Sequence, residues 1–355
     1  MRRLLATLAG VVVVVLAALV LSPAPVHPVA YTPPPPPALS GVLAPNLALR
    51  EAERLLEGRV HGPEDVAFDA QGRLYASTAD GKVVRLGPAG ETEDFVVTGG
   101  RPLGLRFDPR GNLIVCDSLK GLLSVDPGGR MVGRATEAEG VPFRFTDNLD
   151  VARDGAIYFS DASSKFGPDQ YLYDLLEARP HGRLLRHDPP TGRTRVLLPE
   201  LSFANGVALS SAEDFVLVGE TYRYRILRHW LKGPRAGTTD VFADNLPGFP
   251  DNIDRSPRGT FWVALFTVRN PLMDALHPRP WAKRLLSKLP RFAWPRPAPY
   301  GLVLELDEQG RALRSLHDPG GERVTQITTA REHEGNLYLG TLHERWIGRL
   351  ALRLR

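Results

Sequence analysis

Short apolar runs separated by polar turns recur along most of this chain, starting near residue 59. In each repeat a turn of the form Asp-x-x-Gly precedes a β-prone run, as in residues 68–76, 107–115 and 151–159. Looser copies occupy residues 209–218, 255–263 and 332–339, which makes six repeats. Apolar runs of this length bounded by turn residues predict β-strands and hairpins.

A further strand-like run ending in a turn follows most of these hairpins, as in residues 82–86, 122–126 and 183–188. Short strands in repeats of about 40 residues or more are typical of a propeller, in which each blade is a four-stranded sheet. We therefore predict an all-β fold, a six-bladed β-propeller over residues 46–355. A pair of β-sandwiches is the alternative, but it would not place the polar stretches described below at the same point of each repeat.

Two stretches are too long for simple turns, residues 166–180 and 270–300, and we expect loops or short helices on one face of the propeller. The second has aromatic and leucine residues among its basic residues and no acid between them. Three interpretations stay open: a partly buried cover over a blade, a surface resting on anionic lipid headgroups, or a lid over a substrate. The basic residues are Arg279, Lys283, Arg284, Lys288, Arg291 and Arg296.

The N-terminal region reads as a membrane-targeting segment followed by a linker. Residues 1–22 contain two arginines and then a charge-free apolar run from Leu4 to Leu21, which predicts an anchor helix or a signal segment. No clear cleavage site follows, which favours an uncleaved single-pass anchor. The paired arginines would stay cytoplasmic and place the C-terminal domain on the extracytoplasmic side, periplasmic or lumenal. Residues 23–45 predict a Pro-rich linker, an extended spacer without packing of its own.

Composition and missing motifs exclude several classes of function. With 43% hydrophobic and 24% charged residues, the chain is an ordinary globular protein that can bury a core. The net charge of +4 is mild, and no groove-like basic run points to nucleic acid. The single cysteine, Cys116, lies in an apolar run and is expected to be buried rather than catalytic. Zinc spacings, a Walker loop and a Gly-x-Ser-x-Gly elbow are all missing from the sequence.

Candidate chemistry lies where acids and amides come just before or at the start of the first strand of a repeat. In a propeller the innermost strands run along the central axis, so residues at equivalent ends should point at one another. Crowded carboxylates repel unless a cation neutralises them, and oxygen-only ligands suit a hard cation such as calcium. The candidate metal ligands are Glu64, Asp147, Asn148, Asn205, Asp251 and Asn252.

Several motifs together resemble the strictosidine synthase-like family: Gly-Pro-Glu-Asp at 62–65, Phe-Ala-Asn-Gly-Val at 203–207 and Pro-Gly-Phe-Pro-Asp-Asn-Ile at 247–253. The resemblance extends from about residue 59 to the end. It implies a six-bladed propeller related to calcium-dependent gluconolactonases and paraoxonases. It also implies that Glu64, Asn205 and Asp251 ligate a catalytic calcium, with Asn252 adjacent. Asp147 precedes Asn148 where the family usually has Asn before Asp, which adds a negative charge.

The resemblance implies a calcium-dependent hydrolase of lactones or aryl esters, with Asp251 or Asp147 as base or nucleophile. Residues 101–105 contain no histidine, although paraoxonases have one there, and residues 325–329 lack the glutamate of strictosidine synthases. Amine–aldehyde condensation is therefore disfavoured, and a binding or scaffold propeller with a structural calcium is the main alternative. The expected partners are a small lactone or ester and a membrane, reached through the anchor and, in the lipid-surface interpretation, also through residues 270–300. His61 and His317 could lie near the site, although surface or core positions are expected for both.

Overall fold

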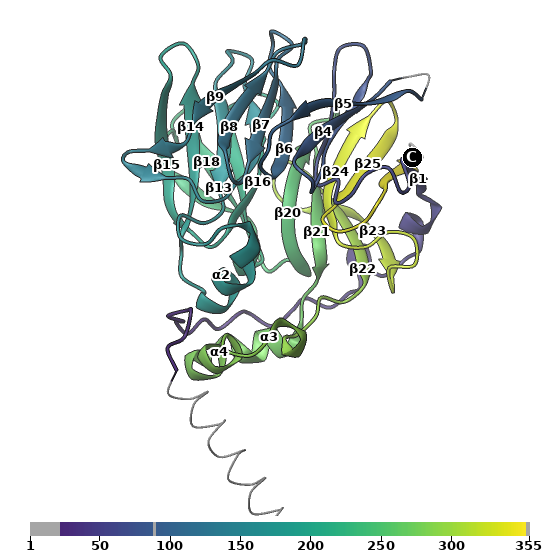
Figure 1. The fold of residues 1–355 in the computed structure, drawn as a ribbon. Coiled ribbons are helices and arrows are strands. Elements are labelled where there is room, and N and C mark those ends of the chain that lie inside the picture. Colours follow the sequence, from purple (N-terminus) through teal and green to yellow (C-terminus); the bar gives the residue numbers. More distant parts are fainter. Residues whose placement is uncertain (1–21, 88–89, 353–355) are drawn as a thin grey trace, which may run out of the picture.

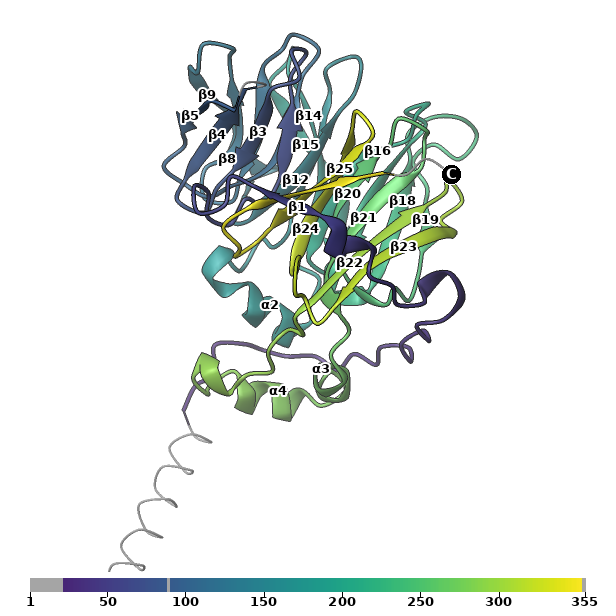
Figure 2. The ribbon, with the colours of Figure 1, turned by 90° about the vertical axis from the view of Figure 1, so that its right-hand side faces the viewer.

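Six four-stranded antiparallel sheets surround a common axis in the computed structural model, which describes residues 22–87 and 90–352 (Figures 1 and 2). The innermost strand of each sheet contacts that of the next, and the sixth contacts the first, so the ring is closed. The predicted six-bladed β-propeller is confirmed. The innermost strands are β2 (Val66–Phe68), β6 (Pro102–Phe107), β12 (Thr146–Val151), β16 (Ala204–Leu209), β20 (Gly248–Arg255) and β24 (Ile327–His333).

Outside each innermost strand the remaining strands follow in chain order. They are β3 (Leu74–Ser77), β4 (Lys82–Leu86) and β5 (Thr92–Val97); β7 (Leu113–Asp117), β8 (Gly121–Val125) and β9 (Met131–Ala135); β13 (Ile157–Asp161), β14 (Gly182–Asp188) and β15 (Arg193–Leu201); β17 (Phe215–Glu220), β18 (Arg225–Trp230) and β19 (Thr239–Ala243); β21 (Phe261–Val268), β22 (Tyr300–Leu306) and β23 (Ala312–Pro319); and β25 (Asn336–Thr341) with β26 (Ile347–Ala351). A small hairpin, β10 (Glu137–Ala138) and β11 (Val141–Pro142), is added outside the ring.

The recurring Asp-x-x-Gly turns join an innermost strand to its neighbour for a local reason. In the first blade, Asp69 Oδ1 accepts hydrogen bonds from the backbone N–H groups of Gln71 (3.0 Å) and Arg73 (2.9 Å). Gly72 has a φ of +73°, which glycine adopts without strain. The carboxylate therefore closes the turn, and Asp108 does the same between β6 and β7 in the second blade. Asp307 closes a turn of the same kind between the outer strands β22 and β23.

The first and last segments of the propeller pair with each other. Strand β1 (Glu53–Leu55) runs antiparallel to β26 and forms the outer strand of the sixth blade, preceded by the 3-10 turns η1 (Gly41–Leu43) and η2 (Ala48–Glu51). The segment that precedes β2 is thus packed into the sixth blade. Ring closure by main-chain hydrogen bonds removes the open edge that an incomplete blade would expose.

The Pro-rich linker is not the free spacer that the sequence predicted. Residues 27–35, which we call the N-terminal strap, lie against the same end of the propeller as the two insertions (Figures 1 and 2). Lys283 Nζ donates to the carbonyl of Val29 (2.6 Å), and Arg269 Nη2 donates to that of Pro34 (2.7 Å). An extended proline-rich backbone makes no internal hydrogen bonds, so its carbonyls are available to these cations.

Both predicted insertions form short helices at this end. The first contains η3 (Pro168–Gln170) and α2 (Tyr171–Glu177), and the second contains α3 (Pro271–Leu276), α4 (Pro280–Leu286) and η5 (Arg291–Ala293). A further 3-10 turn, η4 (Thr221–Arg223), follows β17. Asn270 caps α3 by accepting from the N–H groups of Leu272 (3.0 Å) and Met273 (3.1 Å).

The predicted anchor, residues 1–22, lies almost entirely outside the described part of the chain. Within residues 22–87 and 90–352, no helix has the length and apolar character needed to cross a bilayer. Cys116 in β7 is fully buried and unpaired, as expected.

Candidate metal centre

Breaks in strand pairing coincide with the acid and amide residues singled out in the sequence. The β12–β13 register shifts between Thr146 and Leu149, the β16–β17 register between Ala204 and Val207, and the β20–β21 register between Pro250 and Ile253. Such irregularities re-aim side chains and are common beside functional sites. The residues inside these breaks are Asp147 with Asn148, Asn205 with Gly206, and Asp251 with Asn252.

Four of the predicted residues line one cavity of about 620 Å³ at the end of the axis that carries the insertions: Glu64, Asp147, Asn205 and Asp251. They come from four different blades and are 2%, 4%, 4% and 8% exposed. The structure thus brings these four side chains together, as their equivalent positions in the repeats predicted. Aromatic side chains form much of the wall above them: Phe145, Phe203, Tyr222 and Phe249.

Burial and, after it, mutual repulsion disfavour the charged form of the carboxylates on this floor of the cavity. Burial raises the pKa of Glu64 well above its usual range, and the nearby carboxylate of Asp147 raises it further. The pKa of Asp147 is raised by burial and by Asp251, and that of Asp251 by burial and by Glu64. The partly buried Arg101, whose guanidinium also lines the cavity, opposes these shifts for Glu64 and Asp147. One arginine thus faces three carboxylates.

Asn252 and Asn148, also predicted as ligands, are buried beside the cavity without lining it. The Nδ2 group of Asn252 donates to Glu64 Oε1 (2.9 Å) and Thr329 Oγ1 (2.6 Å), which fixes the orientation of Glu64. The Oδ1 atom of Asn148 accepts from the N–H of Val207 (2.9 Å) and links two blades.

The oxygen atoms of these residues that accept no hydrogen bond would suit a hard cation. Among the six predicted ligands, three buried oxygens have no hydrogen-bond partner: Glu64 Oε2, Asn205 Oδ1 and Asn252 Oδ1. Buried acceptors without partners are costly, and a cation that binds oxygen would satisfy them. Among the described residues no three His, Cys, Asp or Glu side chains are close enough to hold a metal by themselves. A cation here would therefore depend on the asparagine oxygens as well as the carboxylates.

Glycines allow the innermost strands to approach closely at this level. A Cβ atom on Gly206 would lie 2.7 Å from the carbonyl carbon of Asn252 and closer still to the backbone of Asp251. A Cβ atom on Gly104 would lie 2.8 Å from both Asn148 Cα and the carbonyl oxygen of Asp147. Both distances are shorter than real Cβ contacts, so these positions require glycine for the backbones to meet.

A second charged layer, not predicted from the sequence, lies at the centre of the ring. Arg106 is buried between Asp254 (3.1 Å), Asp150 (3.4 Å) and Asp65 (3.8 Å). Arg331 reaches Asp65 (3.2 Å) and Asp254 (3.1 Å) from the sixth blade. We call these five residues the axial ion network. An available signal was the repeated Asn-x-Asp spacing at 148–150 and 252–254.

His61 and His317 occupy the surface and core positions expected for them, and neither lines the large cavity. His317 is buried in β23, where it bonds to Ser315 and Tyr300, and His61 lines a different cavity. His343, from the loop after β25, lines the large cavity and was missed. Burial lowers its pKa, with the charges of Arg101 and His61 adding to the effect.

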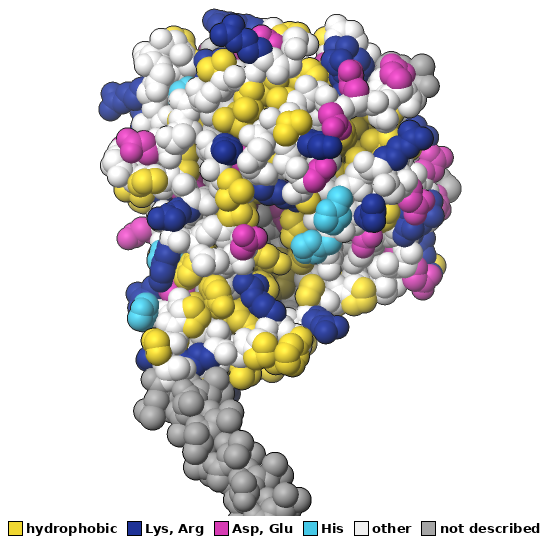
Figure 3. Space-filling model, in the orientation of Figure 1, with side chains coloured by type: hydrophobic (Ala, Val, Ile, Leu, Met, Phe, Trp, Pro, Cys, Tyr) yellow, Lys and Arg dark blue, Asp and Glu magenta, His cyan; other side chains and the backbone are white. Residues whose placement is uncertain are grey.

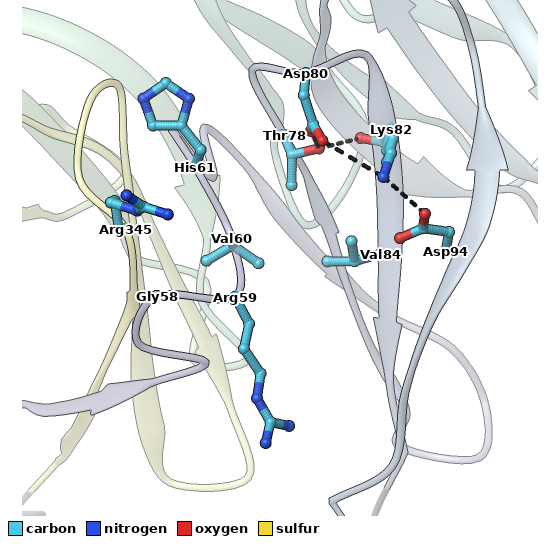
Figure 4. A pocket seen from close by; sticks show the side chains of 10 residues that line it. All are labelled: Gly58, Arg59, Val60, His61, Thr78, Asp80, Lys82, Val84, Asp94 and Arg345. Atoms are coloured by element: carbon cyan, nitrogen blue, oxygen red, sulfur yellow. Dashed lines mark hydrogen bonds and ion pairs between the residues drawn. The ribbon is translucent and has the colours of Figure 1, made fainter.

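The cavity lined by His61 is smaller, about 170 Å³, and lies between the first and sixth blades (Figure 4). Its lysine, Lys82, is paired with Asp94 at 2.8 Å and Asp80 at 3.5 Å. Since these charges neutralise one another, this cavity offers no unmatched group comparable with the carboxylates at the axis.

The closed ring of six four-stranded sheets is the fold of a class of six-bladed propellers that includes gluconolactonases and regucalcin. A gluconolactonase from Xanthomonas campestris superposes with a TM-score of 0.62 at 19% identity, covering 94% of this chain and 99% of that one. The calcium-binding protein regucalcin from Agrobacterium tumefaciens has a TM-score of 0.59 at 15% identity, covering 85% and 95%. These likenesses establish the fold.

Sequence comparison places the chain more narrowly. Residues 147–234 match the strictosidine synthase family model, and residues 41–86 match that of the strictosidine synthase-like N-terminal region. The adipocyte plasma membrane-associated protein of Rattus norvegicus is 43% identical, over 95% of this chain and 96% of that protein. The strictosidine synthase-like 10 protein of Arabidopsis thaliana is 39% identical over 81% and 84%. The chain belongs to the strictosidine synthase-like family, in the branch of the adipocyte plasma membrane-associated proteins.

Proposed function

We propose that this protein is a calcium-dependent hydrolase of lactones or aryl esters that works in association with a membrane. The observation that carries the proposal is the set of buried, unpartnered oxygens at the floor of the large cavity, beside three carboxylates with raised pKa values. The likeness in fold to gluconolactonases supports the reaction class, and the names of the membrane-associated relatives support the location.

In this proposal Glu64, Asn205 and Asp251 hold the cation, and Asp147 adds a fourth oxygen ligand. Asn252 keeps Glu64 in place through its hydrogen bond. Calcium bound there would polarise the substrate carbonyl and stabilise the oxyanion that forms.

The other side chains define what the cavity accepts. The aromatic wall binds the apolar part of an ester or lactone and excludes water around the reacting carbonyl. Arg101 donates to the carbonyl of Gly62 (3.1 Å), which holds its charge beside the carboxylates. Asp147 or Asp251 would take the proton from the attacking water, because both carboxylates line the same cavity.

The test is calcium titration by calorimetry together with hydrolysis assays on a panel of lactones and aryl esters. We expect one calcium site and chelator-sensitive turnover, both lost in Glu64→Gln and Asp251→Asn variants that keep the wild-type circular dichroism. Asp80→Asn, in the smaller cavity, is the matched control and should keep both properties. Calcium binding without turnover on any substrate would instead support a binding propeller with a structural calcium.

A further inference from the structure

The second insertion, residues 270–299, has an inner and an outer face of different character. On the inner face Met273, Lys283 and Trp294 are buried against the propeller and the strap. Its one acid, Asp274, also points inward, bonded to Arg269 (2.9 Å) and the Tyr224 hydroxyl (2.9 Å). The cover over a blade considered in the sequence analysis therefore describes only half of this segment.

The outer face combines exposed aromatic and basic side chains. Trp281 is 71% exposed and Phe292 is 77% exposed. Among the large hydrophobic side chains exposed in residues 22–87 and 90–352, these two are the only aromatic ones. Leu272 is 56% exposed on the same insertion. An exposed tryptophan and phenylalanine so close in sequence indicate a surface that meets an apolar phase.

Unpaired positive charge accompanies these rings. Arg279, Arg284 and Arg296 are exposed, and none of them has an ion pair with a described acid. Figure 3 shows hydrophobic and basic side chains next to one another over α3 and α4 at the lower edge of the molecule. Aromatic side chains with arginines and no exposed acid match the interface of an anionic bilayer, where tryptophan sits at headgroup level.

The course of the N-terminal strap brings the start of the described chain to the same insertion. The strap is fixed to the insertion by the Lys283–Val29 hydrogen bond and by the bond from the N–H of Tyr31 to the carbonyl of His277 (3.1 Å). In Figures 1 and 2 the described chain begins beside α4, away from the hairpin turns of the blades. The 18-residue apolar run at 4–21 therefore enters the described chain next to this outer face.

We propose that the outer face of residues 270–299 docks on anionic lipid headgroups, with Trp281 and Phe292 inserted at the interface and Arg279, Arg284 and Arg296 against the phosphates. The proposal rests on the membrane association given under Proposed function, but not on hydrolysis. It makes this insertion a second, electrostatic contact with the bilayer.

The experiment uses the full chain in nanodiscs that contain brominated phosphatidylcholine, with or without about 30% phosphatidylserine. Bromine quenches nearby tryptophan, and the difference between wild type and Trp281→Phe isolates the Trp281 signal. We expect strong quenching of that signal in anionic discs and at least threefold less in neutral discs. Each arginine near the surface contributes about fivefold to docking, so the variant R279E/R284E/R296E should weaken it by about 100-fold and lose the quenching.

The matched control is R110E/R130E/R193E, which reverses three exposed arginines on hairpin turns at the opposite end of the blades and should retain the quenching. Thermal melts of both variants establish that they fold. Quenching that is absent from wild type in anionic discs, or that survives the 279/284/296 reversal, would overturn the proposal. Shielding of Trp281 only in discs with two chains would also overturn it, because the face would then contact a second copy. Ester or lactone turnover, measured in parallel, reports separately on the proposed function.

Discussion

Replacing Gly206 by alanine should damage the candidate metal centre through the backbone alone. The added Cβ would lie 2.7 Å from the carbonyl carbon of Asn252 and nearer still to the backbone of Asp251, and none of these atoms belongs to a flexible side chain. Because ordinary van der Waals contact begins near 3.4 Å, β16 and β20 must separate by several tenths of an ångström at the level of the ligands. Overpacking of this kind costs about 1–3 kcal/mol.

The entropy of unfolding relates this free-energy cost to a measurable decrease in melting temperature. At about 2.1 cal/mol/K per residue, a propeller of about 300 residues loses roughly 3 °C in melting temperature for 2 kcal/mol. Calcium affinity should fall as well, because Asp251 and Asn252 move with their backbone. Differential scanning calorimetry and calcium titration measure the two effects.

Gly133→Ala is the matched control for this substitution. Gly133 lies in the outer strand β9, and a Cβ there would meet nothing within 4 Å. Alanine at that position should be neutral or stabilise the fold by up to about 1 kcal/mol, through the unfolded chain. The reasoning is refuted if Gly206→Ala melts and binds calcium like Gly133→Ala.

Three further predictions follow from buried charge. Chelation should lower the melting temperature of wild type, by the equivalent of about 4 kcal/mol if calcium had been present at a thousand times its Kd, and it should not affect Glu64→Gln; a chelator-insensitive wild type contradicts this. Arg106→Met leaves Asp150 without a cation and Arg331 as the single cation beside Asp65 and Asp254, and it should cost about 3–5 kcal/mol in urea unfolding, whereas Arg110→Met should be neutral. Burial, together with the charge of Glu177, raises the pKa of Asp174 to about 7. A hydrogen bond from Ser163 and the charges of Lys165 and Arg223 lower this pKa but do not outweigh the effect of burial. The folded state therefore binds this proton more tightly than the unfolded state, and the stability that the proton contributes is lost as pH rises from about 4 to 7. Asp174→Asn should abolish that loss, which is on the order of 4 kcal/mol at pH 8. If the difference in stability between pH 4.5 and pH 8 is the same in Asp174→Asn as in wild type, the prediction is wrong; exposed Asp169→Asn is the charge control.

The blades and four of the cavity-lining residues could be predicted because one type of turn recurs at the same position of the repeats. The Asp-x-x-Gly turn fixes where an innermost strand ends, so the residues before that strand fall at equivalent positions around the axis. This is why Glu64, Asp147, Asn205 and Asp251 could be grouped from sequence alone. Their role as calcium ligands stays a prediction.

Contacts between distant segments without a local pattern could not be predicted. The axial ion network joins residues from five blades, and nothing near Arg106 in sequence specifies its three partners. The strap is bound through its backbone carbonyls, which every sequence has, so its packing left no side-chain signature. His343 reaches the cavity from a loop after β25, and loop paths are the part of a fold least determined by periodicity.

The pairing of β1 with β26 has a consequence for how the protein is made. The ribosome releases Glu53–Leu55 early, yet the partner of this segment emerges almost 300 residues later. Until then β1 has no partner because β24, β25 and β26 are not yet made, and a nascent or prematurely terminated chain exposes main-chain donors and acceptors that invite mispairing with other chains. Quality control during synthesis can therefore recognise an unfinished copy by its unpaired first strand.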